Sequence, residues 1–382
     1  IMMKKFAFFA VAALALAYCS NDETTAVNEG QAIKFRAVVN NATRTSSVSN
    51  LTTNNISSFV VNAKMAGTES PYFVDALFTK GDNGTFTCGT PYYWPLGESL
   101  DFYAYSIAGD GQVSVNDYKT FVVTPVAGED PQHQVDLTYA ATKGRNKEAD
   151  AAAGVSLNFR HTGSKIAAKV KNTNDKLKFE VEGWKVGYLS ASGKFTFADA
   201  NTDGNNSGTL LSASQWSELA EANAETKYAS NFDKKFIAVN TTDPVALDGE
   251  FILVPQTLVG ATNYVKTDGN AQYAVGDKVN GSYIAVKLII KTVASNGNDY
   301  IVAAHADGST VWAIWPISGN WEPGKKYTYT IDLAGGGYYE ENEDNDDPDD
   351  PGLDPLLKDA VIKFVDVTVD EWVDGGEFFP AM

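Results

Sequence analysis

The stretch Val361-Ile362-Lys363-Phe364-Val365-Asp366-Val367-Thr368-Val369 decides which fold and function we expect for this chain. β-Branched and aromatic residues dominate it, and its last three valines alternate with polar residues, which predicts a β-strand. The residues before it, 340–358, are rich in Asp, Glu and Pro and predict an exposed linker. A strand with an apolar face behind such a linker is suited to pairing with a distant partner.

A second stretch of the same kind lies near the other end of the chain: Ala32-Ile33-Lys34-Phe35-Arg36-Ala37-Val38-Val39. Both stretches contain Ile-Lys-Phe, and alternation places Ile33, Phe35, Ala37 and Val39 on one face. We expect the two strands to compete for one groove. Their apolar faces diverge after the shared tripeptide, so either a bulge shifts the face or the two grooves overlap only in part.

Composition predicts an all-β fold of two domains with tails. The chain has 382 residues and a formal net charge of -18, and strand formers punctuated by Gly and Asn outnumber helical patterns. Residues 340–350 supply eight of the negative charges. The sequence has no compact basic patch, so we expect no nucleic-acid partner.

The N-terminal residues predict export. Lys4 and Lys5 precede an apolar run from Phe6 to Tyr18, which suits a signal peptide and is too short to span a bilayer. The sequence around Cys19 resembles a bacterial lipobox, although Tyr18 is larger than the residue that usually precedes the lipidated cysteine. We expect lipidation of Cys19, with ordinary signal-peptidase cleavage after Ala17 as the alternative.

One loop resembles half of a calcium site. Asp199, Asn201, Asp203 and the following glycine match the first half of an EF-hand loop, but Leu210 stands where the bidentate glutamate belongs. The same residues are typical of ordinary turns, so the turn is favoured over the metal site. We expect no cofactor.

Other chemically notable residues favour structural roles. Cys88 has no histidine in its surroundings and is expected to be a small buried residue. His161 has no histidine or acid at ligand or triad spacing and is expected in a loop or in the core. The aromatic cluster Tyr92-Tyr93-Trp94 favours core packing over sugar stacking, and residues 214–222 predict a short helix. We find no catalytic motif and expect no enzyme.

With these residues in view, the chain resembles the fimbrillins, the subunits of type V pili. The resemblance covers nearly all of the chain and rests on the order of several short stretches: the lipobox region, Ile33 to Arg44, Tyr93-Trp94-Pro95 with Phe102 to Tyr105, Phe159-Arg160-His161 with Ser164-Lys165-Ile166, Val254 to Leu258, and Trp321 to Tyr327.

The resemblance implies two tandem transthyretin-like β-sandwich domains and an outer-membrane lipoprotein precursor. It further implies that an arginine-specific protease cuts at Arg44, with Arg36 a poorer second choice, and that a neighbour's C-terminal strand fills the groove so opened. The donor residues would be Ile362, Phe364, Val365, Val367 and Val369. The corresponding segments are a signal peptide (1–19), a propeptide (20–44), two β-sandwiches (45–160 and 161–337), an acidic linker (338–360) and the donor strand with its tail (361–382).

Two functions remain open at this stage. The first is a pilus subunit that polymerises with other copies or related subunits by protease-triggered donor-strand exchange and supports adhesion. The second is a monomeric surface lipoprotein that binds a glycan or a host protein, with its C-terminal strand folded onto its own body.

Overall fold

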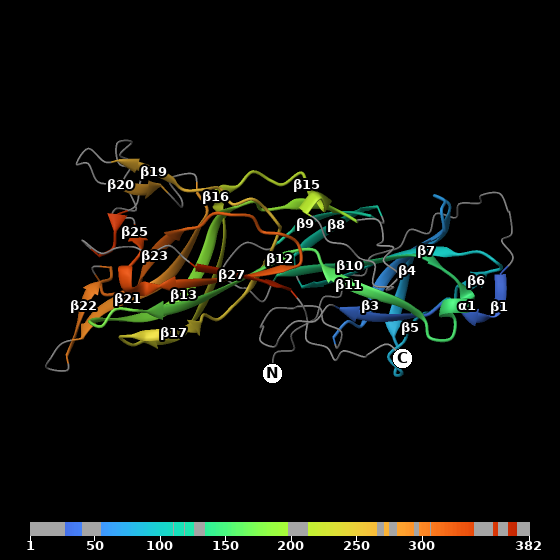
Figure 1. Ribbon diagram of the computed structural model, residues 1–382, viewed down its shortest axis with the longest axis horizontal. Helices are drawn as coiled ribbons and strands as arrows, with labels where there is room; N and C mark the ends of the chain where they lie inside the picture. Colours follow the sequence, from blue (N-terminus) through green and yellow to red (C-terminus); the bar gives the residue numbers. More distant parts are fainter. Residues whose placement is uncertain are drawn as a thin grey trace, which may run out of the picture.

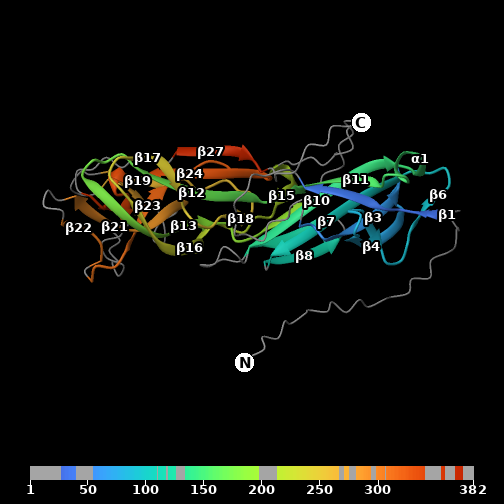
Figure 2. The same cartoon turned by 90° about the horizontal axis from the view of Figure 1, so that it is seen from below.

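The computed structural model describes residues 27–39, 55–109, 111–117, 119–125, 134–197, 213–265, 271–274, 281–293, 298–305, 307–339, 354–357 and 366–372. Within these ranges nearly all regular structure is β-strand, and the helical pieces are α1 (Lys147–Asp150), η2 (Ala213–Gln215) and η3 (Leu333–Gly335). The all-β prediction is confirmed. The strands gather in two groups along the long axis of the molecule (Figures 1 and 2). Among the same residues, no helix combines the length and the apolar character that crossing a bilayer would need.

The first group of strands forms a closed barrel, in which each strand is hydrogen-bonded to a neighbour on both sides. The sequence predicts a sandwich at this place. Around the ring the order is β10 (Val135–Arg145), β11 (Val155–His161), β2 (Phe35–Val39), β5 (Phe86–Cys88), β4 (Pro71–Lys80), β3 (Ser58–Met65) and β7 (Leu100–Gly109). The inward side chains are mostly aromatic and aliphatic and form one continuous core. The leading strand β2 is therefore a member of the ring.

The second group is a pair of sheets packed face to face. One sheet runs β17 (Thr241–Ala246), β12 (Ser164–Asn172), β24 (Lys325–Asp332), β27 (Asp366–Glu371), with β18 (Phe251–Leu253) also on β12. The other runs β16 (Asn223–Ile237), β13 (Leu177–Leu189), β21 (Tyr283–Val293), β23 (Val311–Pro316), β25 (Tyr338–Tyr339), β26 (Asp354–Pro355), with β22 (Asp299–Ala303) also on β21. A large apolar core fills the space between them. A hairpin of β19 (Thr262–Val265) and β20 (Ala271–Ala274) stands apart.

A smaller sheet joins the two groups. It runs β15 (Trp216–Ser217), β14 (Gly193–Thr196), β9 (Thr120–Thr124), β8 (Gln112–Asp117), and so combines strands from before and after the predicted boundary at residue 160. Phe121 and Phe195 pair across β9 and β14 and belong to a core cluster of their own. The chain passes directly between the groups at Thr162 and Gly163, which separate β11 from β12.

The helix expected at residues 214–222 is wrong. The structure has one 3₁₀ turn there, followed by the short strand β15. Trp216 is buried, its ring lies 5.5 Å from that of Phe195, and its indole donates to the carbonyl of Thr162 at 2.9 Å. This tertiary packing fixes an extended backbone and overrides a weak local helix preference.

The acidic linker is not wholly exposed. Residues 354–355 form β26 against β25, and the side chains of Leu356 and Leu357 pack on the second core. Gly336 and Gly337 have φ of 77° and 72°, and a Cβ at Gly336 would lie 2.7 Å from Leu357. The absence of a side chain at Gly336 therefore leaves the room that Leu357 occupies. Residues 340–353 and 358–365 lie outside the described part.

Tyr329 on β24 makes the free energy of unfolding depend on alkaline pH. Burial raises the pKa of its hydroxyl from 10.0 to about 12. Between these values the unfolded chain has lost the proton that the folded chain keeps, so stability falls as pH rises from about 10 to about 12 and is unaffected below. Tyr329→Phe should lose less stability than wild type between about pH 8 and about pH 11, measured by urea unfolding.

The exposed Tyr300 on β22 supplies the matched control for this measurement. Tyr300→Phe should follow wild type over the same interval. An equal alkaline loss in Tyr329→Phe and wild type would contradict the assignment to Tyr329.

Candidate assembly site

The leading strand β2 completes the first ring of strands. It runs parallel to β11, from Phe35 opposite Val155 to Val39 opposite Phe159, and meets β5 at Phe86. Two further main-chain bonds hold its start: the amide of Val155 donates to Lys34 at 2.9 Å, and the amide of Ile33 donates to Tyr92 at 2.7 Å. Without β2, the facing edges of β11 and β5 would lack a strand between them.

The side chains of β2 and its start lie in the middle of the first core. Ile33, Phe35 and Val39 are at most 2% exposed. The Phe35 ring makes edge contacts with Phe59, Phe78 and Phe102 at centroid distances of 6.0, 4.7 and 5.1 Å. Burying the three apolar side chains contributes about 5–9 kcal/mol in all. The prediction that one face of this strand is buried is confirmed.

A second strand precedes β2 and lies at the far end of the same group. β1 (Val27–Ala32) pairs with β6 (Tyr93–Pro95), with Val27 opposite Pro95 and Ala32 opposite Tyr93. The predicted propeptide, residues 20–44, contains both β1 and β2. Its removal would therefore open two edges of the first group together. We call the space between β11 and β5, with its aromatic lining, the β2 site.

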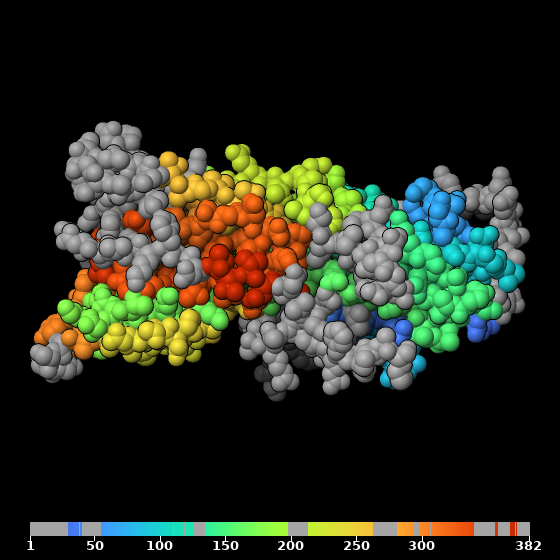
Figure 3. All heavy atoms as spheres, in the orientation of Figure 1, coloured from blue at the N-terminus to red at the C-terminus, as the bar shows by residue number. Residues whose placement is uncertain are grey.

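The trailing strand lies on the second group in this structure. The part of it that is described, β27, pairs antiparallel with β24, with Val369 opposite Tyr327 and Val367 opposite Tyr329. Figure 3 shows these residues as a red patch on the orange surface of the second group. Description of the trailing strand starts at Asp366, and Ile362, Phe364 and Val365 lie outside the described range. The second function considered from the sequence, a monomeric surface lipoprotein, requires this folded-back arrangement.

The valines of β27 are incompletely buried. Val367 and Val369 are 46% and 51% exposed, although the tyrosines opposite them on β24 are buried. β27 is the outermost strand of its sheet and has a neighbour on one side only among the described strands. Each half-exposed valine gives up roughly 1 kcal/mol relative to full burial.

Trp372, directly after β27, is the buried end of the trailing segment. Its side chain is 3% exposed and its ring stacks flat on His161, with 3.7 Å between centroids and 7° between planes. Its amide donates to the carbonyl of Gly324 at 2.8 Å, and Ile252 packs beside it. The Nζ atom of Lys165 lies 5.6 Å from the ring centre. The described part of the trailing segment, residues 366–372, therefore reaches the turn that connects the two groups of strands.

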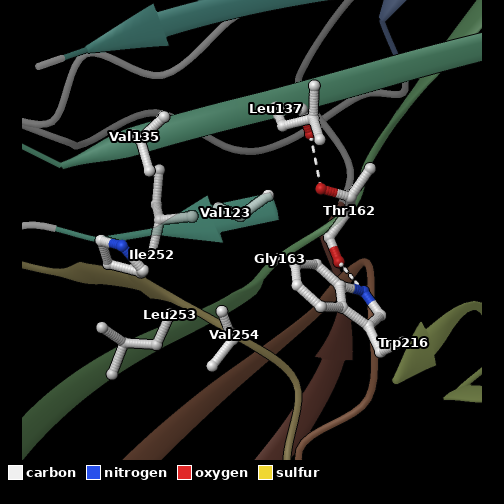
Figure 4. A pocket seen from close by; sticks show the side chains of 10 residues that line it. Val123, Val135, Leu137, Thr162, Gly163, Trp216, Ile252, Leu253 and Val254 are labelled. Carbon is white, nitrogen blue, oxygen red and sulfur yellow. Dashed lines mark hydrogen bonds between the residues drawn. The ribbon is translucent and has the colours of Figure 1, made fainter. Parts of the chain in front are cut away.

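A small pocket lies at the same junction (Figure 4). Its walls come from the joining sheet, from β10 and β18, and from the 162–163 turn, with Val135, Trp216 and Ile252 among them. The hydroxyl of Thr162 donates to the carbonyl of Leu137 at 2.9 Å, and its own carbonyl accepts from the Trp216 indole. Because the lining is apolar and the polar groups of Thr162 are already paired, the pocket is a packing space and not a ligand site.

Several predicted site residues lie outside the described ranges: Cys19, Arg44, Asp199, Asn201 and Asp203. Their roles stay predictions. Within the described ranges no group of three or more His, Cys, Asp or Glu side chains could hold a metal ion. Arg36, the second cleavage candidate, lies exposed within β2.

The remaining residues singled out in the sequence have structural partners. Trp94 is fully buried and the Tyr92 ring stacks on Phe73 at 4.2 Å, so the core interpretation of that cluster is confirmed. His161 is buried as expected, but it does have an acidic partner: its Nδ1 lies 2.9 Å from Asp136 on β10. The expectation that Cys88 is buried is wrong: it is a free thiol at the end of β5, only partly buried against the first core.

Sequence reasoning missed Trp372 and its contacts. In the alternation of the trailing strand, Trp372 falls on the side of Thr368 and Asp370, opposite to the valines. A tryptophan at the end of a valine-rich strand was the one available signal. Its partner His161 is far away in the sequence, and no local pattern connects the two.

A known protein family matches most of the chain. The model of the family described as fimbrillin-like matches residues 43–345. The match begins after β2 and ends before β26 and β27, so both predicted exchange strands lie outside it. No curated protein matches the chain.

Solved structures of fimbrial proteins are similar to the chain to different degrees. A fimbrial protein from Bacteroides vulgatus is similar with a TM-score of 0.53 at 13% identity, over 89% of this chain and 99% of that one. The tip fimbrial protein Mfa3 from Porphyromonas gingivalis, solved with a C-terminal truncation, gives 0.34 at 10% identity, over 89% and 99%. A fimbrial assembly protein from Parabacteroides distasonis gives 0.30 at 12% identity, over 81% and 90%. Of these three, the first supports the overall fold.

Phe35→Ala should strongly destabilise the chain if β2 belongs to the core. We expect the free energy of unfolding to fall by about 3–5 kcal/mol, because a cavity would open among three aromatic rings. Urea unfolding of the full chain measures it. Arg36→Ala, on the exposed side of the same strand, is the matched control and should change stability by less than about 0.5 kcal/mol. Equal effects of the two variants would place β2 outside the cooperative core.

Proposed function

Because this chain belongs to the fimbrillin-like family, we propose that it is a structural subunit of a surface fimbria that polymerises by donor-strand exchange. The precursor is a lipoprotein held at the outer membrane through Cys19. An arginine-specific protease cuts at Arg44 and removes residues 20–44. The trailing strand of another copy, or of a related subunit, then fills the β2 site, and the assembled fimbria supports adhesion to a surface receptor.

The observation that carries the proposal is the position of β2 in the first core. An N-terminal strand contributes both its main chain and its side chains to a ring whose other members follow later in the chain. Strand addition satisfies such a site, because main-chain bonds give affinity and alternate side chains give specificity. The division into domains 45–160 and 161–337, of transthyretin-like type, is part of the same proposal.

The position of Arg36 supports cleavage at Arg44. Arg36 is the second residue of β2 and stands opposite Ser156 of β11, so its peptide bond is held in a paired strand. Proteases act on exposed segments that are free to adopt an extended conformation in their active sites. A cut after Arg36 would also leave residues 37–39, three of the five residues of β2, in place. Arg44 lies in a polar stretch, which is the kind of sequence that proteases reach.

The trailing strand has enough apolar surface to hold two subunits together. Full burial of Ile362, Phe364, Val365, Val367 and Val369 would contribute about 8–15 kcal/mol before ordering costs. The contact would be head-to-tail, with different surfaces on the two partners. Such contacts generate a filament when they do not close into a ring.

A monomeric surface adhesin is the second candidate. It is favoured by the pairing of β27 with β24 of the same chain, which leaves the trailing strand occupied. In that case the chain would be a lipoprotein that binds a glycan or a host protein directly. The two candidates differ in whether the trailing strand leaves β24.

Deletion of residues 359–382 distinguishes them. We expect the processed chain to form a ladder of heat-sensitive oligomers on denaturing gels, and the deletion variant to form none, because the donor strand is gone. Thermal unfolding of the variant, followed by circular dichroism, should show that the body remains folded. An unchanged ladder would reject donation by this tail.

Arg44→Ala tests the processing step. The variant should accumulate as a membrane-associated precursor, because the leading strand stays in the β2 site and no neighbour can enter. N-terminal sequencing of the surface form provides the measurement. Arg36→Ala is the control and should be processed as wild type. Normal processing of Arg44→Ala would show that the cut lies elsewhere.

A further inference from the structure

We propose that Trp372 anchors the trailing strand in a folded-back state on β24, and that release of this anchor limits the rate at which the strand is donated. This inference rests on the proposed function and adds a regulatory step to it. It concerns β24, the turn 162–163 and residues 366–372, none of which belongs to β11 or β5, although His161 at the end of β11 contacts Trp372.

The anchor has a specific binding surface. Trp372 is covered by His161 on one ring face, and Ile252 packs beside it. Gly163 lies below it: a Cβ there would be 4.0 Å from the indole and 2.9 Å from Ile252, so a side chain would crowd the surface that the indole uses. His161 is itself fixed by its contact with Asp136. A preformed apolar and aromatic surface therefore receives one large side chain.

The strand before the anchor matches the charge of the edge on which it lies. In the antiparallel register Lys326, whose Nζ bonds Glu250 at 2.7 Å, stands opposite Asp370. Opposite charges across a strand pair favour that pair. The amide of Trp372 then closes the pairing at Gly324. Register, charge and anchor all select the same segment, residues 366–372.

The folded-back state is nevertheless incomplete. Val367 and Val369 remain about half exposed, and the indole N–H of Trp372 is buried with no hydrogen-bond acceptor in the described part of the chain. A buried donor without an acceptor weakens the state that contains it. A site that covers both valines would make the apolar contacts that β24 leaves unmade, at the cost of releasing the indole. The folded-back state therefore holds the strand only until a better site becomes available.

The consequence for assembly is kinetic. While the leading strand occupies the β2 site and the trailing strand occupies β24, both exchanging strands are paired within one subunit. A neighbour competes with an intramolecular contact, whose effective concentration is high. Only the fraction of subunits with a released strand can donate, so weakening the anchor raises that fraction.

Hydrogen–deuterium exchange of the full chain tests the anchor without any polymerisation. In Trp372→Ala, amides in 366–372 and in β24 should exchange about tenfold faster or more, because the segment opens more often. Trp372→Phe should lie between this variant and wild type. Phe236→Ala, at a residue 74% exposed on β16, is the matched aromatic control and should leave the exchange of both segments unchanged. Exchange in Trp372→Ala equal to wild type would overturn the proposal.

A second measurement follows the oligomer ladder after the leading segment has been removed. Trp372→Ala should form the ladder several-fold faster than wild type at equal concentration, with Trp372→Phe between them. Equal or slower assembly by Trp372→Ala would overturn the regulatory role. If exchange accelerates in the variant while no chain, wild type included, forms a ladder, then the anchor stands and donor-strand exchange fails.

Discussion

The packing of Phe35 among Phe59, Phe78 and Phe102 is the contact on which the first half of the molecule depends. It commits a segment from the start of the chain to the centre of a core built from strands that come later. Because β2 joins β11 to β5, the same segment also completes the main-chain pairing of the ring. A core that depends on one terminal strand is stable with it and receptive to a replacement without it.

The sequence contained the local part of this structure. Alternation identified the buried face of β2, and composition identified the all-β fold. It also identified Trp94 as a core residue. What it could not supply were the pairings between residues far apart in the chain. Asp136 as the partner of His161 and the β9–β14 contact across residue 160 arise from tertiary packing. The expected helix at 214–222 failed for the same reason, since packing of Trp216 outweighed local propensity.

The sequence predicted only part of the candidate site. The alternation of Val367 and Val369 with polar residues predicted the trailing strand. The same alternation places Trp372 on the polar side of the strand, so it did not predict that Trp372 is buried. The linker was another partial success. Its acidic composition predicted exposure, while Leu356 and Leu357 pack on the second core, where Gly336 leaves room for Leu357. Two leucines in an acidic segment are a weak signal unless the surface that receives them is known.

The docking of Leu357 has a mechanical consequence for any fibre built from this chain. With Leu357 fixed on the sheet, only residues 358–360 separate it from the proposed donor strand 361–369, which corresponds to about 10–11 Å of fully extended chain. Successive subunits would then be joined by a short strap. Neighbouring bodies could tilt or swivel only within that span, so the fibre would resist bending and would keep a nearly constant repeat along its length.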